Sequence, residues 1–169
     1  MDEAEEAAYA EFVSTRWRDL VRAAVFLGAE PHEAEDLTQT ALVRCYTGWA
    51  RVSGADNRDA YVYRMLLNTL RDVRRSPWWR KRADVEIPTD AGVEDRTDAV
   101  LTADAVHRAL VGLSKVNREV VVLRYFVQLT EAQTAAALGV PTGTVKSRLS
   151  RALANLAKDR HLQEIGEWP

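Results

Sequence analysis

The sequence contains very little cysteine and histidine. Its 169 residues include one cysteine, Cys45, and three histidines, His32, His107 and His161. A single cysteine cannot form an intrachain disulfide, and the histidines lack the spacing of a zinc site. We therefore expect no metal or other cofactor, and we expect Cys45 to be a small buried apolar residue.

Signals for membranes, secretion and catalysis are also missing. No uninterrupted apolar run approaches the roughly 20 residues that cross a bilayer, and residues 1–6 are acidic where a secretory signal would be basic and then apolar. The chain has no carboxylate cluster with metal spacing, no phosphate-binding glycine loop and no nucleophile paired with a base. We expect a soluble, cytoplasmic protein without membrane insertion or enzymatic activity.

The net charge of -2 argues against a general nucleic-acid coat, but the charges are segregated along the chain. Residues 1–40 hold ten acids and three bases, whereas residues 41–82 hold three acids and ten bases. Residues 83–110 then hold seven acids and two bases, and residues 111–160 hold eight bases and three acids. This alternation favours a protein that contacts DNA at two places and another partner through its remaining surface.

Apolar periodicity predicts an all-α chain with no strands, made of two small helical domains. Residues 76–102 have proline, glycine and acidic residues without an apolar period, so they are expected to form a flexible linker. The expected helices are 5–27, 32–50 and 57–75 before the linker, and 103–112, 115–127, 131–138 and 142–158 after it.

Two of these helices, 131–138 and 142–158, are expected to form a helix-turn-helix. Thr130 and Gln133 have the spacing of a capping box, Gly139 suits a helix end, and Pro141 with Thr142 suits the next helix start. On the second helix, an apolar side carries Val145, Leu149, Ala152, Leu153 and Leu156. The opposite side is polar and cationic, as expected for a helix that enters the major groove.

The helix over 57–75 is also two-sided. Its apolar side carries Val62, Leu66, Thr69 and Val73, and its other side carries Arg64, Asn68, Arg71 and Arg75. Just before it, Trp49, Arg51 and Arg58 bracket a short loop, 52–57. Aromatic rings among cations suit single-stranded nucleic acid, because rings stack on bases while cations hold the backbone.

Four blocks together resemble the extracytoplasmic-function (group 4) sigma factors of the sigma-70 family, of actinobacterial type. They are residues 34–44 (AEDLTQTALVR), 60–68 (AYVYRMLLN), 118–126 (REVVVLRYF) and 143–149 (GTVKSRL). The resemblance implies a bacterial initiation factor that binds core RNA polymerase, through its β and β′ subunits, and starts transcription of a specific regulon. An anti-sigma factor is a possible further partner.

The resemblance also implies a division of the chain. Residues 1–75 would be sigma region 2, 76–102 the linker, 103–160 sigma region 4 and 161–169 a short tail. The core-polymerase contacts would come from Asp36, Leu37, Gln39 and Thr40.

The same resemblance implies which residues contact the two promoter elements, −10 and −35. The −10 element would be melted and held as a single strand, with a base pocket near the loop 50–58, and the −35 element would be read as duplex. The −10 residues would be Trp49, Arg51, Asn57, Arg58, Arg64, Asn68, Arg71 and Arg75. The −35 residues would be Thr142, Thr144, Lys146, Ser147, Arg148, Ser150 and Arg151.

The alternative interpretation is a stand-alone regulator that uses the helix-turn-helix alone. Its N-terminal domain would then be a dimerisation module, and the protein would bind a palindromic duplex without polymerase.

Overall fold

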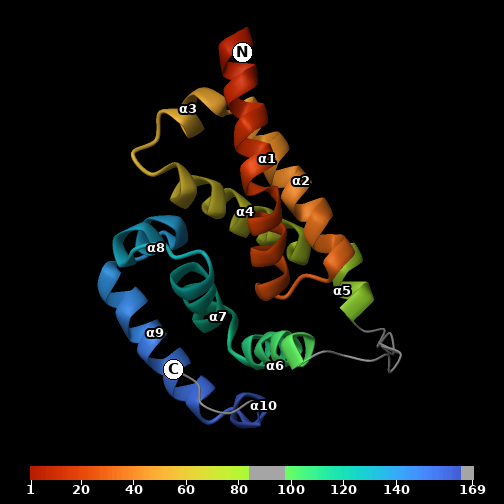
Figure 1. Cartoon of the computed structure of the whole chain (residues 1–169), viewed down its shortest axis with the longest axis vertical. Coiled ribbons are helices and arrows are strands. Elements are labelled where there is room, and N and C mark those ends of the chain that lie inside the picture. The colour runs from red at the N-terminus through yellow and green to blue at the C-terminus, as the bar shows by residue number, and fades with distance from the viewer. Residues whose placement is uncertain (84–97, 165–169) are drawn as a thin grey trace.

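The structure, a computed structural model, describes residues 1–83 and 98–164, with side chains for 1–81 and 101–164. Within these ranges every regular element is helical and none is a strand, so the all-α prediction is confirmed (Figure 1). The elements form two lobes, which we call the N-terminal lobe (1–83) and the C-terminal lobe (98–164).

In the N-terminal lobe, the long helix α1 packs against α2, and α2 packs against α4. The chain starts α1 with a capping box between Asp2 and Glu5, in which each side chain accepts from the other residue's backbone N–H. The turn to α2 passes through Gly28 at φ 103°, a conformation that side chains rarely adopt. The helices are α1 (Glu3–Phe26), α2 (Pro31–Thr47), α3 (Trp49–Ser53), α4 (Arg58–Arg75) and α5 (Pro77–Ala83).

In the C-terminal lobe, α9 packs against both α7 and α8, while α10 closes on α6. The predicted capping box is confirmed, since Thr130 Oγ1 accepts from Gln133 N at 3.1 Å and Gln133 Oε1 accepts from Thr130 N at 2.8 Å. Gly139 ends α8 at φ 67°, as a left-handed cap. The elements are α6 (Asp98–Gly112), α7 (Lys115–Val121), the π-helix η1 (Val122–Phe126), α8 (Glu131–Leu138), α9 (Thr142–Ala157) and α10 (Arg160–Gln163).

The boundaries differ from the predictions at several places. The loop expected at 50–58 contains the short helix α3, and the predicted helix 115–127 changes from α to π geometry at Val122. The expected linker 76–102 begins with α5, because proline is well tolerated in the first turn of a helix, and α6 already starts at Asp98. The rest of that linker, 84–97, and the end of the tail, 165–169, lie outside the described residues.

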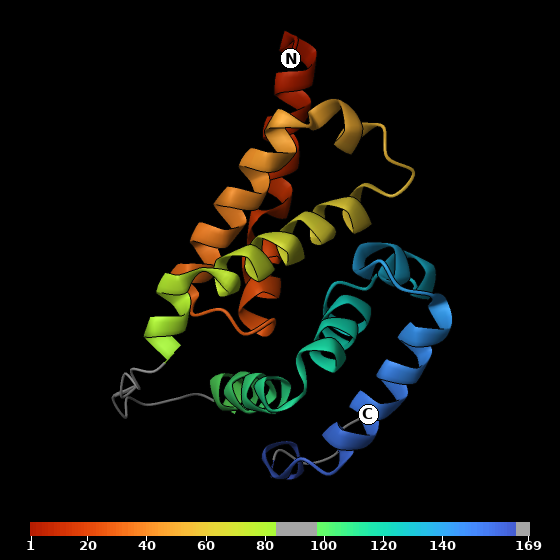
Figure 2. The same cartoon turned by 180° about the vertical axis from the view of Figure 1, so that it is seen from behind.

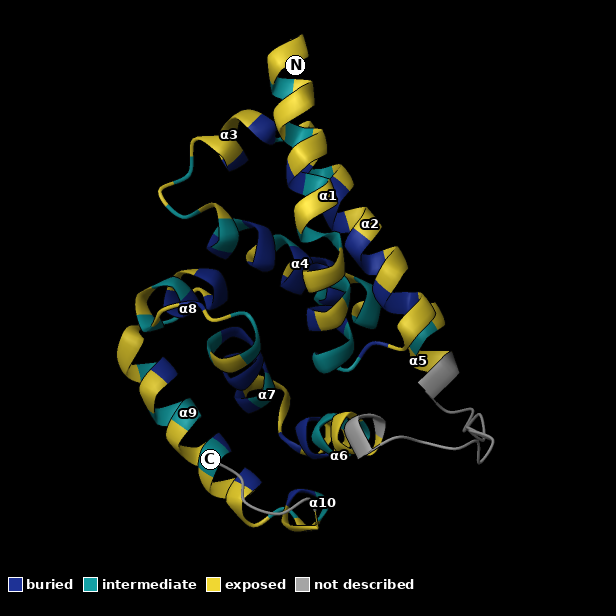
Figure 3. Ribbon diagram, in the orientation of Figure 1, coloured by how far each residue is buried: buried dark blue, intermediate teal, exposed yellow. Residues whose placement is uncertain are grey.

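Buried residues line the inner side of α2, α4 and α7 (Figure 3). Leu67 and Val120 are completely buried, one in each lobe. Cys45 is also fully buried, which confirms the prediction, and burial raises the pKa of its thiol to about 11. The core therefore leaves the polar sides of α4 and α9 for other contacts.

The two lobes touch. Helix α8 packs against α4, and α1 packs against both α6 and η1; the view from behind shows α7 and α8 beside α4 (Figure 2). At this junction the rings of Phe26 and Phe126 lie 4.3 Å apart between centroids, tilted by 43°. Contacts between the lobes therefore include ring packing as well as helix packing.

Leu67→Ala should lower the free energy of unfolding by about 2–5 kcal/mol, because it leaves a cavity where α4 packs into the core. Urea unfolding followed by circular dichroism measures this loss. Leu101→Ala is the matched control, because Leu101 is 49% exposed on α6. Equal losses for the two variants would contradict the assignment of the core.

Candidate nucleic-acid interface

Helix α9 places its apolar side inward. Val145 and Ala152 are fully buried, and Leu156 is 3% exposed. The sequence-predicted −35 residues lie around the remaining circumference. Thr142, Lys146, Ser150 and Arg151 are exposed, whereas Thr144, Ser147 and Arg148 are half-buried.

Two contacts organise this outer surface. Ser147 Oγ donates to the carbonyl of Thr144 at 3.1 Å, so its hydroxyl is already bonded within the helix. Lys146 Nζ lies 3.5 Å from Glu131 Oε1, but the Lys146 side chain is 70% exposed. An exposed pair of this kind restrains a side chain weakly, so Glu131 does not hold Lys146 in one position.

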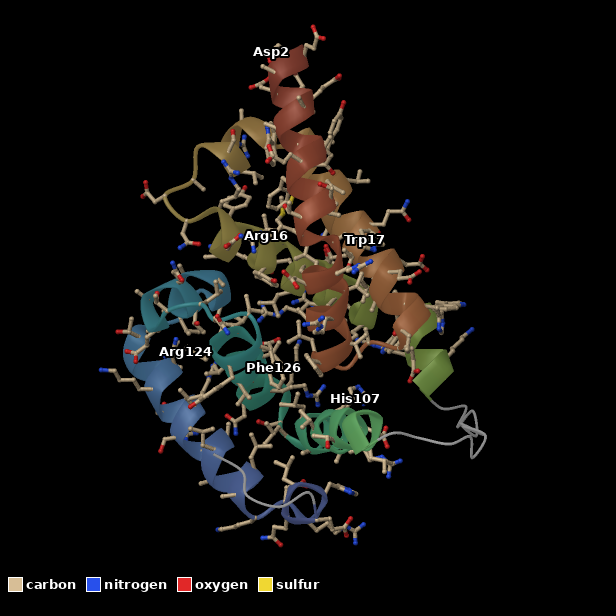
Figure 4. All side chains as sticks on the ribbon, viewed as in Figure 1. Asp2, Arg16, Trp17, His107, Arg124 and Phe126 are labelled. Atoms are coloured by element: carbon tan, nitrogen blue, oxygen red, sulfur yellow. The ribbon has the colours of Figure 1, made fainter. Side chains whose placement is uncertain are left out.

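Arg124, labelled in Figure 4, supports the helix-turn-helix from η1. Its guanidinium donates to the carbonyl of Leu129, one residue before the cap of α8. The chain between them turns through Gln128 at φ 63°. Arg124 thereby fixes where α8 begins, and α8 in turn packs against α9.

A hollow of about 540 Å³ lies between α1 and the segment that joins α3 to α4. Asn57 lines it and also caps α4, since its Oδ1 accepts from Ala60 N at 2.7 Å. Arg16 crosses from α1 to Asp59 at 3.0 Å and fixes the wall of the hollow. The polar lining residues, including Glu11, Asp56 and Arg58, converge at the position where the sequence predicted a base pocket.

Trp49 lies beneath this hollow rather than in it. It is 2% exposed, and its ring meets Tyr9 edge-on at 5.2 Å and Phe12 at 5.6 Å. The guanidinium of Arg58 lies 5.6 Å from the ring centroid of Trp49, within the range of a cation–π contact. The expectation that Trp49 touches DNA is therefore corrected: its ring supports Arg58, which is exposed.

The arginine side of α4 is divided. Arg64, Asn68 and Arg75 are exposed, as is Arg51 on α3. Arg71 is different, because its side chain is 25% exposed and its Nη2 lies 3.0 Å from Glu119 Oε2 in the C-terminal lobe. The sequence brought Arg71 into the set without indicating this partner.

The predicted polymerase-docking residues lie on α2. Asp36, Gln39 and Thr40 are exposed, and Thr40 Oγ1 donates to the carbonyl of Asp36 at 2.9 Å. Leu37 is 3% exposed, so its predicted role as a contact is corrected to a role in the core. Leu37 packs α2 against the core, and the same helix exposes Asp36, Gln39 and Thr40.

Sequence reasoning missed an apolar groove beside these residues. The groove, about 460 Å³, lies between α1 and α2 and is lined by Tyr9, Val13, Trp17, Gln39 and Val43, among others. Val43 is 56% exposed. The sequence signal was Val43, an apolar residue that stands one helical turn after the polar Gln39.

Sequence reasoning also assigned no role to Arg118 and Glu119, which begin one of the four quoted blocks. Glu119 is 3% exposed and Arg118 is half-buried. The burial of these two charged residues is not visible in the sequence, because residues that bond to them, Arg71 and Leu27, lie far away in the chain.

Among residues 1–83 and 98–164, no helix is long and apolar enough to cross a membrane. The described residues also contain no group of three His, Cys, Asp or Glu side chains that could hold a metal ion.

The two-lobed helical fold with an outward-facing helix-turn-helix defines a DNA-binding protein. Family comparison gives the particular class, because residues 12–80 match Sigma-70 region 2 and residues 103–156 match Sigma-70, region 4. The chain belongs to the sigma-70 family, as an extracytoplasmic-function sigma factor of actinobacterial type.

Individual relatives agree with this assignment. The chain is 40% identical to the RNA polymerase sigma-E factor of Streptomyces avermitilis, over 98% of this chain and 92% of that protein. It is 34% identical to the ECF RNA polymerase sigma factor SigM of Mycobacterium tuberculosis, over 89% and 76%. The sigma factor RpoE of Bartonella quintana, solved with the anti-sigma factor NepR, has a similar fold, with a TM-score of 0.67, 24% identity, and 95% and 99% of the two chains covered.

Asn57→Ala should lower the free energy of unfolding by about 0.5–2 kcal/mol, because it removes the cap of α4. Asn57→Asp is the control, since aspartate caps equally well. Thermal unfolding followed by circular dichroism compares the three proteins. If the alanine variant melts with the wild type, the cap contributes nothing to stability.

Proposed function

We propose that this sigma factor brings core RNA polymerase to promoters by three separate surfaces of its two lobes. Residues 1–75 bind the polymerase and the −10 element, residues 103–160 bind the −35 element, and 76–102 join them. The observation that supports this most directly is the outward polar side of α9, backed by buried Val145 and Ala152. The polymerase performs the chemistry, and the sigma factor acts in the cytoplasm without enzymatic activity of its own.

In this proposal α9 lies in the major groove of the −35 element. Lys146 and Arg151 are exposed cations that reach guanine edges or phosphates, and Ser150 with Thr142 bonds to either. Arg148 is half-buried, so it contacts the backbone at the edge of the groove.

The −10 strand is held in the N-terminal lobe. The hollow beside Asn57 accepts a base that has left the stack, and Arg58, fixed by the ring of Trp49, holds a neighbouring phosphate. Arg64, Asn68 and Arg75 continue the contact along α4. The same lobe docks on the polymerase β′ subunit through Asp36, Gln39 and Thr40, on another helix.

An anti-sigma factor is a further proposed partner. RpoE of Bartonella quintana, which shares the fold, was solved with one. The apolar groove between α1 and α2 offers an apolar surface of this chain for such a partner.

Run-off transcription with purified bacterial core polymerase and a library of genomic promoter fragments tests the proposal. Transcripts that appear only with this protein support it and give the promoter sequence. Duplex binding by the protein alone, without any transcript, would favour the stand-alone regulator.

Lys146→Ala combined with Arg151→Ala should reduce transcription from the selected promoters by about 30-fold or more, since each lost groove contact costs about 1–3 kcal/mol and the two together about 2–6 kcal/mol. Lys158→Ala with Arg160→Ala is the matched control, because these exposed cations lie at the far end of α9 and in α10. Equal loss in both double variants would mean that net charge, not groove contact, matters.

Asp36→Ala combined with Gln39→Ala should weaken binding to core polymerase about tenfold, as expected when oriented polar contacts leave an interface. Binding is measured by competition against a labelled wild-type sigma factor. Glu6→Ala with Gln163→Ala, at exposed positions elsewhere, serves as control. Unchanged competition by the first variant would place the docking surface on another helix.

A further inference from the structure

A cluster of charged residues joins the two lobes. Arg71 on α4 meets the buried carboxylate of Glu119 on α7 at 3.0 Å. The carbonyl of Leu27, at the end of α1, accepts at 3.2 Å from Arg74 on α4 and at 3.2 Å from Arg118 on α7. These contacts, with the ring contact between Phe26 and Phe126, hold the C-terminal lobe against α1 and α4.

The cluster contains more cations than anions. Burial lowers the pKa of Arg74, of Arg118 and of Lys115, and Arg74 further lowers the pKa of Arg118. Glu119 opposes these shifts in all three groups. The junction is therefore cationic, and the carboxylate of Glu119 reduces the repulsion among its cations.

Both the backbone conformation and the space at Gly28 favour glycine in the turn beside the junction. A Cβ atom on Gly28 would lie 2.6 Å from Nη1 of Arg118 and 3.0 Å from Nη2 of Arg74. At φ 103° the residue also has a conformation that suits glycine. The turn between α1 and α2 thus admits the two guanidinium groups that meet at Leu27.

This arrangement covers part of the side of α4 that we propose for DNA. At 100° per residue, Arg71 lies within about 60° of Arg64, Asn68 and Arg75, at one edge of the arc that they span. Helix α8 packs against α4, and Glu119 Oε2 takes the position on Arg71 that a phosphate oxygen would need. Exposed Asp36 and Gln39 on α2 take no part in the junction.

We propose that the contact between Arg71 and Glu119 is an autoinhibitory latch, in which a carboxylate of the C-terminal lobe replaces a DNA phosphate and keeps the lobes closed. The inference rests on the proposed role of α4 in holding the −10 strand. Polymerase can dock on α2 while the latch is closed, and separation of the lobes then frees Arg71 for the strand.

The closed state also carries a cost that opening removes. The second oxygen of Glu119, Oε1, is buried and accepts no hydrogen bond from any described residue. A buried acceptor without a partner is unfavourable, and water satisfies it once the lobes separate. The unpartnered oxygen therefore lowers the cost of opening the lobes.

Glu119→Gln tests the latch in the full chain, because it keeps the shape of the side chain and removes the charge that offsets the nearby cations. Small-angle X-ray scattering without DNA should give a larger radius of gyration than the wild type. The dissociation constant for a fluorescein-labelled, mixed-sequence, single-stranded DNA 20-mer should fall about tenfold, as the open fraction rises.

Two further variants complete the experiment. Phe26→Ala removes a contact of the junction without a change in charge, so it should also expand the protein and tighten binding to the 20-mer. Asp72→Asn is the matched control, because it also removes one negative charge from an ion pair with an arginine. Asp72 on α4 pairs with Arg44 on α2, so this pair lies inside one lobe. It should leave the radius of gyration unchanged and improve DNA binding less than Glu119→Gln does.

Closed dimensions in both Glu119→Gln and Phe26→Ala would overturn the latch. The latch would also be overturned if Glu119→Gln expanded the protein but bound the 20-mer no more tightly than Asp72→Asn does, because closure of the lobes would then not inhibit DNA binding. These outcomes leave the proposed function intact, since run-off transcription by the wild type tests that function separately.

Discussion

The hydrogen bonds donated by the guanidinium of Arg118 are the interactions on which the arrangement of both lobes depends. Its Nε donates to the carbonyl of Leu110 at 2.9 Å, and its Nη2 donates to those of Val111 at 2.9 Å and Leu113 at 3.0 Å. The last carbonyls of a helix have no partner inside the helix, so one arginine caps α6. Its remaining Nη1 reaches Leu27 in the other lobe, and the cap of one helix becomes a contact between lobes.

Local sequence was sufficient where local chemistry decides the structure. Thr130 and Gln133 are three residues apart, so their capping box, and with it the start of α8, follows from spacing alone. The same holds for the buried side of α9, where Val145 and Ala152 repeat with the helical period. Family resemblance then added roles for these helices that periodicity cannot supply.

Sequence reasoning was incomplete where the partner is distant. Arg71 and Glu119 are 48 positions apart, and nothing near either residue indicates that they meet. Trp49 was assigned to DNA because it stands among arginines, but the short helix α3 turns its ring toward Tyr9 and Phe12. Leu37 was assigned to the polymerase with its neighbours, although an apolar residue within a polar motif more often faces the core.

Segregated charge explains how one chain of net charge -2 can hold several cationic surfaces. The cations of α9 face outward, whereas Arg71 of α4 meets a carboxylate of the C-terminal lobe and Arg74 donates to the carbonyl of Leu27 in its own lobe. Each acceptor replaces part of the solvation that a buried guanidinium loses. Since a phosphate backbone offers the same kind of acceptor at higher charge density, the groups that stabilise the closed protein are the groups best suited to leave it for DNA. In the proposed latch, closure of the two lobes and DNA binding therefore compete for the donors of Arg71 on α4.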